Sequence, residues 1–145
     1  MRVPAIFLAV AAAAAITAPA VPASAHTVKM LNKGAAGTMV FENAILRIKP
    51  GESVTFTPDD MGHNVESIPG MLPAGAQSFK GQMSKTLTVT FTRPGVYGFK
   101  CAPHLGMGMV GLVVVGNPVN LAQARTVTLP GRAQRVMSDL LARVQ

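Results

Sequence analysis

Short runs of apolar and β-branched residues, separated by Gly and Pro at intervals of roughly ten residues, fill the chain from Thr27 to Gly116. This spacing is typical of an antiparallel β-sandwich or barrel. In Lys85–Arg93 the apolar residues alternate with threonines, which predicts a strand with one buried and one solvated face. Seven or eight strands are predicted, with candidates at Thr27–Leu31, Thr38–Glu42, Ala44–Lys49, Glu52–Thr57, Asn64–Ile68, Lys85–Arg93, Val96–Cys101 and Val110–Val115.

The pattern changes after Pro118, where the period of two gives way to helical spacing. The apolar positions that recur at this spacing are Ala133, Val136, Met137, Leu140, Leu141 and Val144. They predict an amphipathic helix whose apolar stripe is of ordinary width, which favours docking on the sandwich over binding to a membrane or partner. Residues 119–125 predict a shorter helix, so 118–145 is expected to form a helical C-terminal extension.

The first 25 residues read as a signal peptide. A short basic start precedes an apolar stretch at Ala5–Ala18, and Ala23–Ala25 supplies the small residues that a signal peptidase needs. The apolar stretch is too short to span a bilayer comfortably, so no membrane anchor is predicted. Cleavage would leave 26–145 as a single exported domain, and the loss of Arg2 would lower the formal charge from +7 to +6.

A single cysteine in an exported protein is unusual. Export favours disulfides, but Cys101 is the only cysteine and has no intramolecular partner. The nine residues that begin at Cys101 also contain His104, Met107 and Met109. A thiol at the end of a strand and an imidazole in the next turn can reach one ion, because the chain reverses there. Thiolate, imidazole and thioether favour copper, and a His₂Cys site with a weak axial Met is an electron-transfer arrangement.

The second imidazole must come from elsewhere in the chain. His63 follows Gly62 in a loop that opens into a strand, which makes it the better candidate. His26 would be the first residue after cleavage and could bind copper through its amine and ring. Such a histidine brace needs a second positioned histidine, and His63 and His104 are better used with the thiol. Spacing alone does not decide between Met107 and Met109 as the thioether.

Several segments resemble the cupredoxin family of blue copper proteins, and within it the pseudoazurin group. They are Met30–Gly34, Met39–Glu42, Gly62–Glu66, Pro94–Gly98 and Cys101–Gly111, followed by the helical tail. The resemblance covers the whole chain after residue 25 and implies an all-β, eight-stranded Greek-key sandwich with C-terminal helices. It also implies one type 1 copper ion held at one end of the sandwich by His63, Cys101, His104 and Met109. The family loop decides for Met109 over Met107.

Two positions depart from the family pattern. A hydroxyl residue commonly follows the cysteine and ties the ligand loops together through the asparagine after the first histidine. Here Ala102 stands at that position, so we predict that no side-chain bridge joins residue 102 to Asn64. Relatives often carry lysine where Met61 stands, which removes one charge from the docking ring that the family implies. The matching lysines are Lys33, Lys80 and Lys100.

These features predict a periplasmic one-electron carrier and not an enzyme, because four protein ligands leave copper no open position for a substrate. The resemblance implies a monomer that exchanges electrons with a redox protein with an acidic docking surface, such as nitrite reductase in denitrification or a cytochrome. A periplasmic copper carrier or chaperone is the alternative. The basic charge does not indicate nucleic acid, since the chain has no Trp, one Tyr and no binding motif.

Overall fold

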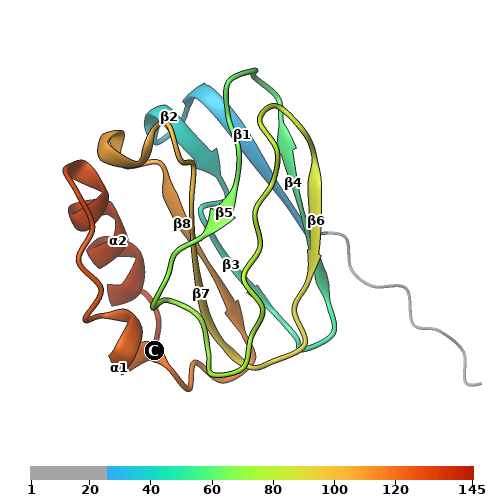
Figure 1. Ribbon diagram of the computed structural model, residues 1–145. Coiled ribbons are helices and arrows are strands. Elements are labelled where there is room, and N and C mark those ends of the chain that lie inside the picture. Colours follow the sequence, from blue (N-terminus) through green and yellow to red (C-terminus); the bar gives the residue numbers. More distant parts are fainter. Residues whose placement is uncertain (1–25) are drawn as a thin grey trace, which may run out of the picture.

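Two four-stranded sheets stack face to face in the computed structural model, which describes residues 26–145 (Figure 1). The predicted signal peptide at 1–25 lies outside the described residues. The first sheet has the order β2-β1-β4-β6 and the second β3-β8-β7-β5. The strands are β1 (His26–Gly34), β2 (Gly37–Glu42), β3 (Ile45–Ile48), β4 (Ser53–Pro58), β5 (Glu66–Ser67), β6 (Leu87–Thr90), β7 (Gly95–Lys100) and β8 (Val110–Val115).

The predicted sandwich of about eight strands is confirmed, but its sheets are mixed and not purely antiparallel. β1 runs parallel to β4, and β3 runs parallel to β8. The expectation of an antiparallel sandwich is therefore wrong for these two pairs. The alternation of apolar and polar residues fixes which face of a strand is buried, but it does not fix the direction of the neighbouring strand.

The observed strand boundaries agree with the predicted ones to different degrees. β8 has the predicted bounds, and all six of its residues are buried. β6 covers only Leu87–Thr90 of the predicted Lys85–Arg93, although its threonines do face solvent and Leu87 and Val89 point inward. β5 is reduced to two residues, because the Gly- and Pro-rich segment on either side of it runs as loops.

Aromatic side chains fill the space between the two sheets. The Phe99 ring lies 4.9 Å from that of Phe41 and 5.0 Å from that of Phe56, in both cases edge to face. Val28, Met30, Val54, Val113 and Val115 complete the centre of this core, and all are fully buried. Edge-to-face aromatic pairs add about 0.5–1.5 kcal/mol each beyond the burial of their surface. The core supports β1, β4, β7 and β8, whose ends carry the site described below.

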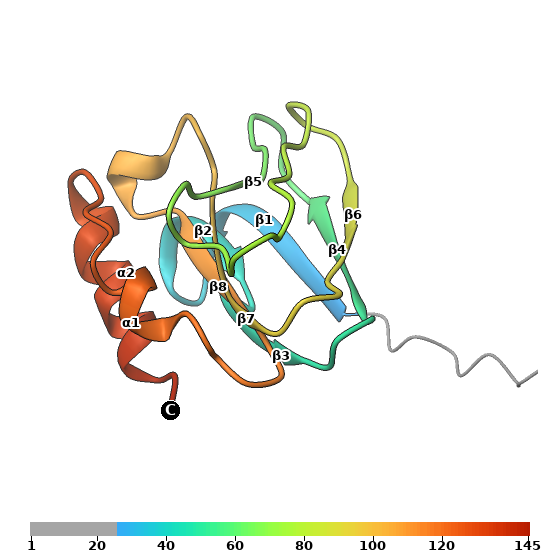
Figure 2. The same ribbon diagram turned by 60° about the horizontal axis from the view of Figure 1, so that its bottom comes forward.

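Two helices cover the outer face of the second sheet (Figures 1 and 2). They are α1 (Leu121–Ala124) and α2 (Arg132–Ala142). The predicted stripe is buried against β8 and β7 through Ala133, Met137, Leu140, Leu141 and Val144, with Val136 partly buried. The prediction of a docked helix is confirmed. No helix among residues 26–145 is long and apolar enough to cross a membrane.

The side of β7 that faces β5 is completed by groups from outside the sheet. β5 pairs only with Phe99 and Lys100. Further back along β7, Gly98 donates its N–H to the Met71 carbonyl, and its own carbonyl accepts from Ile68. At Val96 the backbone N–H and carbonyl are both bonded by the side chain of Asn120, at 2.6 and 2.9 Å. An asparagine from the helical extension thus takes the place of a strand at the start of β7.

Candidate metal centre

Three donor atoms converge at one end of the sandwich. Cys101 follows β7, His104 precedes the 3₁₀ turn η1 (Leu105–Met107), and His63 lies in the loop before β5. The Cys101 sulfur is 3.7 Å from Nδ1 of His63 and 3.4 Å from Nδ1 of His104, and the two Nδ1 atoms are 3.1 Å apart. His63 and Cys101 are fully buried, whereas His104 is half-buried. The structure therefore brings together the three donors predicted from sequence.

The dimensions of this triangle fit a metal ion. The point equidistant from the three donors lies about 2.0 Å from each of them, which is a typical metal–imidazole distance and slightly shorter than a metal–thiolate one. One thiol and two imidazoles are also the donor set that suits copper. The residues present thus fit the ion that the sequence predicts.

The two methionines of the loop differ sharply in exposure. Met109 is fully buried, and its carbonyl accepts a hydrogen bond of 3.0 Å from the N–H of Cys101. Met107 lies in η1 with 46% of its surface exposed. Because a thioether ligand must share the buried site with the thiol, this difference favours Met109, the residue chosen from the family resemblance.

Asn32 orients the His63 ring, a role that was not predicted from the sequence. Its Oδ1 lies 2.9 Å from Nε2 of His63. An oxygen acceptor at that distance places the ring proton on Nε2, which leaves the Nδ1 lone pair directed at the other donors. Asp60 supports this contact, since its carboxylate accepts a hydrogen bond from the Asn32 N–H at 2.7 Å. Asn32 lies within the matched segment Met30–Gly34, but nothing in that segment shows where its side chain points.

The environment of both buried donors favours their neutral forms. Burial raises the pKa of the Cys101 thiol, an effect opposed by the backbone N–H groups of Asn64 and His104. Burial also lowers the pKa of His63, and the neighbouring His104 lowers it further. A neutral imidazole is ready to bind a metal, whereas the thiol must first lose its proton. Metal binding at this site is therefore coupled to proton release.

The bridge between the two donor loops survives the loss of the hydroxyl at residue 102. The N–H of Ala102 donates to Oδ1 of Asn64 at 2.8 Å, and the Asn64 amide donates to the Gly81 carbonyl at 3.4 Å. The prediction that the Asn64 side chain forms no bridge to residue 102 is therefore wrong. It considered only a side-chain partner, whereas the backbone of residue 102 supplies the donor.

Exposed apolar side chains lie on and beside the loops that carry the donors. Three methionines near the donor loops have exposed side chains: Met61 at 75%, Met83 at 49% and Met107 at 46%. Met61 is adjacent to Gly62, whose N–H donates to Ser84, so the segments that carry Met61 and Met83 lie together. Exposed methionines therefore lie on or beside the donor loops, at the end of the sandwich where His104 is the most solvated of the three donors.

The three matching lysines differ in their surroundings. Lys80 and Lys100 share one carboxylate, with their Nζ atoms 3.7 and 3.3 Å from Glu66. The Lys100 side chain is only 22% exposed. Lys33 is exposed and forms none of the ion pairs found in residues 26–145. The positive charge around the site is therefore partly neutralised by Glu66.

His26 lies apart from the three donors. Its Nε2 is 3.2 Å from a Glu52 carboxylate oxygen. Asn32 follows it six positions later in extended β1, a span of roughly 20 Å. The structure therefore does not bring His26 into the cluster of donors, in line with the choice of His63.

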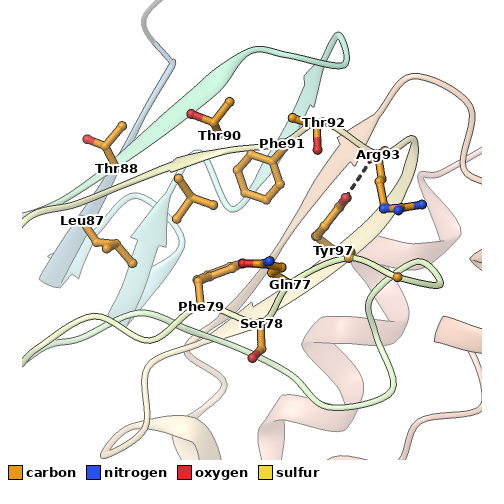
Figure 3. A pocket seen from close by; sticks show the side chains of 13 residues that line it. Gln77, Ser78, Phe79, Leu87, Thr88, Thr90, Phe91, Thr92, Arg93 and Tyr97 are labelled. Carbon is orange, nitrogen blue, oxygen red and sulfur yellow. Dashed lines mark hydrogen bonds between the residues drawn. The ribbon is translucent and has the colours of Figure 1, made fainter.

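One hollow of the described residues lies away from the donors. It measures about 520 Å³ and lies between β6 and the segment 75–79, with Tyr97 and Arg93 at one end (Figure 3). The Tyr97 hydroxyl donates to the Arg93 carbonyl at 2.8 Å, which braces the turn before β7. None of the three donors lines this hollow, although Asn64 and Ala102, which are next to two of them in sequence, line another of about 590 Å³.

Comparison with known proteins agrees with this geometry. Residues 28–116 match the family described as copper binding proteins, plastocyanin/azurin family. A pseudoazurin from Paracoccus pantotrophus is 52% identical over 137 residues, which cover 92% of this chain and 94% of that protein. The pseudoazurin structure from Methylobacterium extorquens AM1 superposes with a TM-score of 0.81 at 49% identity, covering 84% of this chain and all of that one. The pseudoazurin from Hyphomicrobium denitrificans gives the same TM-score at 41% identity, with 84% and 99% coverage.

Both the family match and these relatives cover most of the residues that the structure describes. The chain therefore belongs to the plastocyanin/azurin family of copper-binding proteins, and within it to the pseudoazurins, which supports a copper electron carrier and not an enzyme.

Proposed function

We propose that this protein is a periplasmic one-electron carrier whose type 1 copper ion is held by His63, Cys101, His104 and Met109. The observation that carries the proposal is the buried triangle of one thiol and two imidazole nitrogens, with edges of 3.1 to 3.7 Å. Bound copper supplies one-electron chemistry by alternating between Cu(I) and Cu(II). The protein's own contribution is to hold the donors in place and to exclude water.

Rigid support for the donors suits this task, because a carrier that reorganises little can exchange electrons quickly. Asn32 fixes His63, and Asn64 ties the loop of residue 102 to Gly81. The backbone of Met109 is bonded to that of Cys101. We propose His104 as the point where electrons enter and leave, since it is the only one of the four residues that is not fully buried.

Addition of Cu(II) to the purified copper-free protein tests the function. We expect an intense visible absorption band, caused by charge transfer from a thiolate to Cu(II), which bleaches when ascorbate is added. The amplitude should saturate at one copper ion per chain. A colourless complex would contradict the proposed site. A coloured complex that gives up its copper readily to a competing chelator would instead favour the copper carrier.

The first residues of the protein and its relatives both bear on its location. We propose that 1–25 directs export and is removed, and that 26–145 functions in the periplasm as one domain with 118–145 as its helical extension. The pseudoazurin relatives cover nearly the whole chain, which supports the same location.

We further propose that the protein works as a monomer and docks through the apolar surface around His104 on a redox protein with an acidic surface. Nitrite reductase and a cytochrome are the candidates. The support is the exposed methionines at this end together with the nearby Lys33, Lys80 and Lys100. Attraction between the lysines and an acidic partner would raise the encounter rate more than the affinity.

Met61→Lys tests this docking arrangement. A lysine at this exposed position adds a charge close to His104, so the rate of electron transfer to an acidic partner should rise by a factor of about 2 to 5 at low ionic strength. The gain should vanish as salt is added. Stopped-flow kinetics against ionic strength would measure both effects.

Val119→Lys is the matched control. Val119 is 64% exposed and lies next to Asn120, which binds the start of β7, at the opposite end from Cys101. The same added charge should leave the rate nearly unchanged there. Equal acceleration by both variants would show that net charge, and not the proposed surface, controls the encounter.

A further inference from the structure

The C-terminal helix begins in direct contact with the loop that carries His104 and Met109. Gly131 caps the N-terminus of α2 with φ +56° and ψ −136°. A Cβ atom built on Gly131 would lie 2.7 Å from the Gly106 carbonyl oxygen, closer than real Cβ contacts allow. The backbones of the helix start and of the loop are therefore in contact.

A second contact lies two residues further along the loop. A Cβ atom on Gly108 would be 3.1 Å from Cγ of Arg132 and 3.1 Å from Cγ2 of Val136. At that distance the neighbouring side chains would have to give way by a few tenths of an ångström. A cavity of only about 70 Å³ remains where the loop, β2 and α2 meet. The outer side of the loop is thus packed on the first turns of α2, with little free space.

Hydrogen bonds within the loop connect these contacts to the donors. Met107 and Met109 both donate their N–H groups to the His104 carbonyl, at 3.0 and 3.3 Å. Gly108 donates to the Leu105 carbonyl at 2.9 Å, and Cys101 donates to that of Met109 at 3.0 Å. A displacement of the Gly108 backbone is therefore expected to move the residues on either side of it as well.

We propose that α2 is a positioning element of the metal centre, in which Gly131, Arg132 and Val136 set the position of the His104–Met109 loop relative to Cys101. A helix that contributes no ligand would thereby tune the reduction potential of bound copper, since the position of the thioether donor is one of the quantities that would set it. The inference rests on the proposed function for its copper readout, but the packing itself can be measured in the copper-free protein.

The contact between Gly108 and α2 can be tested with two variants, Gly108→Ala alone and Gly108→Ala combined with Val136→Ala. Gly108→Ala should change the visible spectrum and the reduction potential of the copper-loaded protein, and shift the amide NMR resonances of residues 104–109 in the copper-free protein. The double variant Gly108→Ala, Val136→Ala removes one of the two colliding groups, so both readouts should return toward those of the parent protein.

Gly51→Ala is the matched control for backbone strain. Gly51 has φ +92°, against +91° for Gly108, and a Cβ atom there would meet nothing within 4 Å. The two single variants should lose similar stability from strain, but Gly51→Ala should leave the spectrum, the potential and the amide resonances of residues 104–109 unchanged. Val136→Ala alone enlarges the cavity without altering Gly108, and it should shift the Met107 and Gly108 amides even if Gly108→Ala does not fold.

The outcomes distinguish a failure of the positioning role of α2 from a failure of the proposed function. Unchanged amide resonances in Gly108→Ala and Val136→Ala would overturn the positioning role, as would changes in Gly108→Ala that Val136→Ala does not reverse. If the parent protein gives no charge-transfer band with Cu(II), the proposed function fails instead. The amide shifts and their reversal still test the helix–loop contact in that case.

Discussion

Cys101→Ser is expected to abolish the intense visible absorption of the copper-loaded protein. The band arises from a thiolate bound to Cu(II), and a serine hydroxyl at the same position neither ionises near neutral pH nor binds copper comparably. The affinity for copper should fall by more than about 100-fold, the upper end of the loss seen when only a supporting residue is removed. Absorption spectroscopy and competition with a chelator would measure the two effects.

Ala102→Ser provides the matched control for this variant. Residue 102 is exposed, and its backbone N–H, not its side chain, makes the bond to Asn64. A serine there should therefore keep the colour, while any change in potential would report on the added hydroxyl. Survival of an intense band in Cys101→Ser would show that another residue supplies the donor, and the assignment of the site would be wrong.

Asn120→Ala is expected to destabilise the fold by about 2–4 kcal/mol, because it leaves both the N–H and the carbonyl of Val96 without partners. Each buried group left unsatisfied costs about 1–3 kcal/mol, and Asn120 is only 8% exposed. This loss is large against the roughly 5–15 kcal/mol by which domains are stable. Urea unfolding of the copper-free protein would measure it without the added stability that a bound ion contributes.

Asn117→Ala serves as the comparison for the helical extension. Asn117 is exposed and only three residues away, so its replacement should change the free energy of unfolding by less than about 0.5 kcal/mol. If Asn120→Ala is equally mild, water must enter and satisfy Val96, and the asparagine would not be needed to complete β7.

The elements that could be located from sequence are those whose buried face can be recognised within their own segment of the chain. Val110–Val115 is apolar throughout, and the stripe of α2 repeats at helical spacing, so each element shows its own buried surface. β6 has an equally clear alternation but ends early. The alternation of Lys85–Arg93 marks the inward face, but it does not mark where the pairing with β4 stops: β4 continues to Pro58, whereas the last pair is Phe56 with Leu87.

The residues of the metal centre also differ in whether the sequence alone could locate them. Cys101, His104 and Met109 lie within nine residues, and their proximity follows from one reversal of the chain. His63 could be chosen because only three histidines exist. The contact of Asn32 with His63 spans 31 positions in sequence and depends on how β1 lies beside the donor loop. Such supporting contacts leave no local pattern, so only the structure shows them.

The pairing of β3 with β8 has a consequence for how the chain folds. Ile45 lies opposite Leu112, and β3 has no other strand beside it in its sheet. Contacts between residues so distant in sequence must overcome a large loss of chain entropy before they contribute any stabilisation. The second sheet therefore closes only after β8 has been synthesised. The loop that carries Cys101, His104 and Met109 joins β7 to β8, so it too is completed only when this last strand of the sandwich has been synthesised.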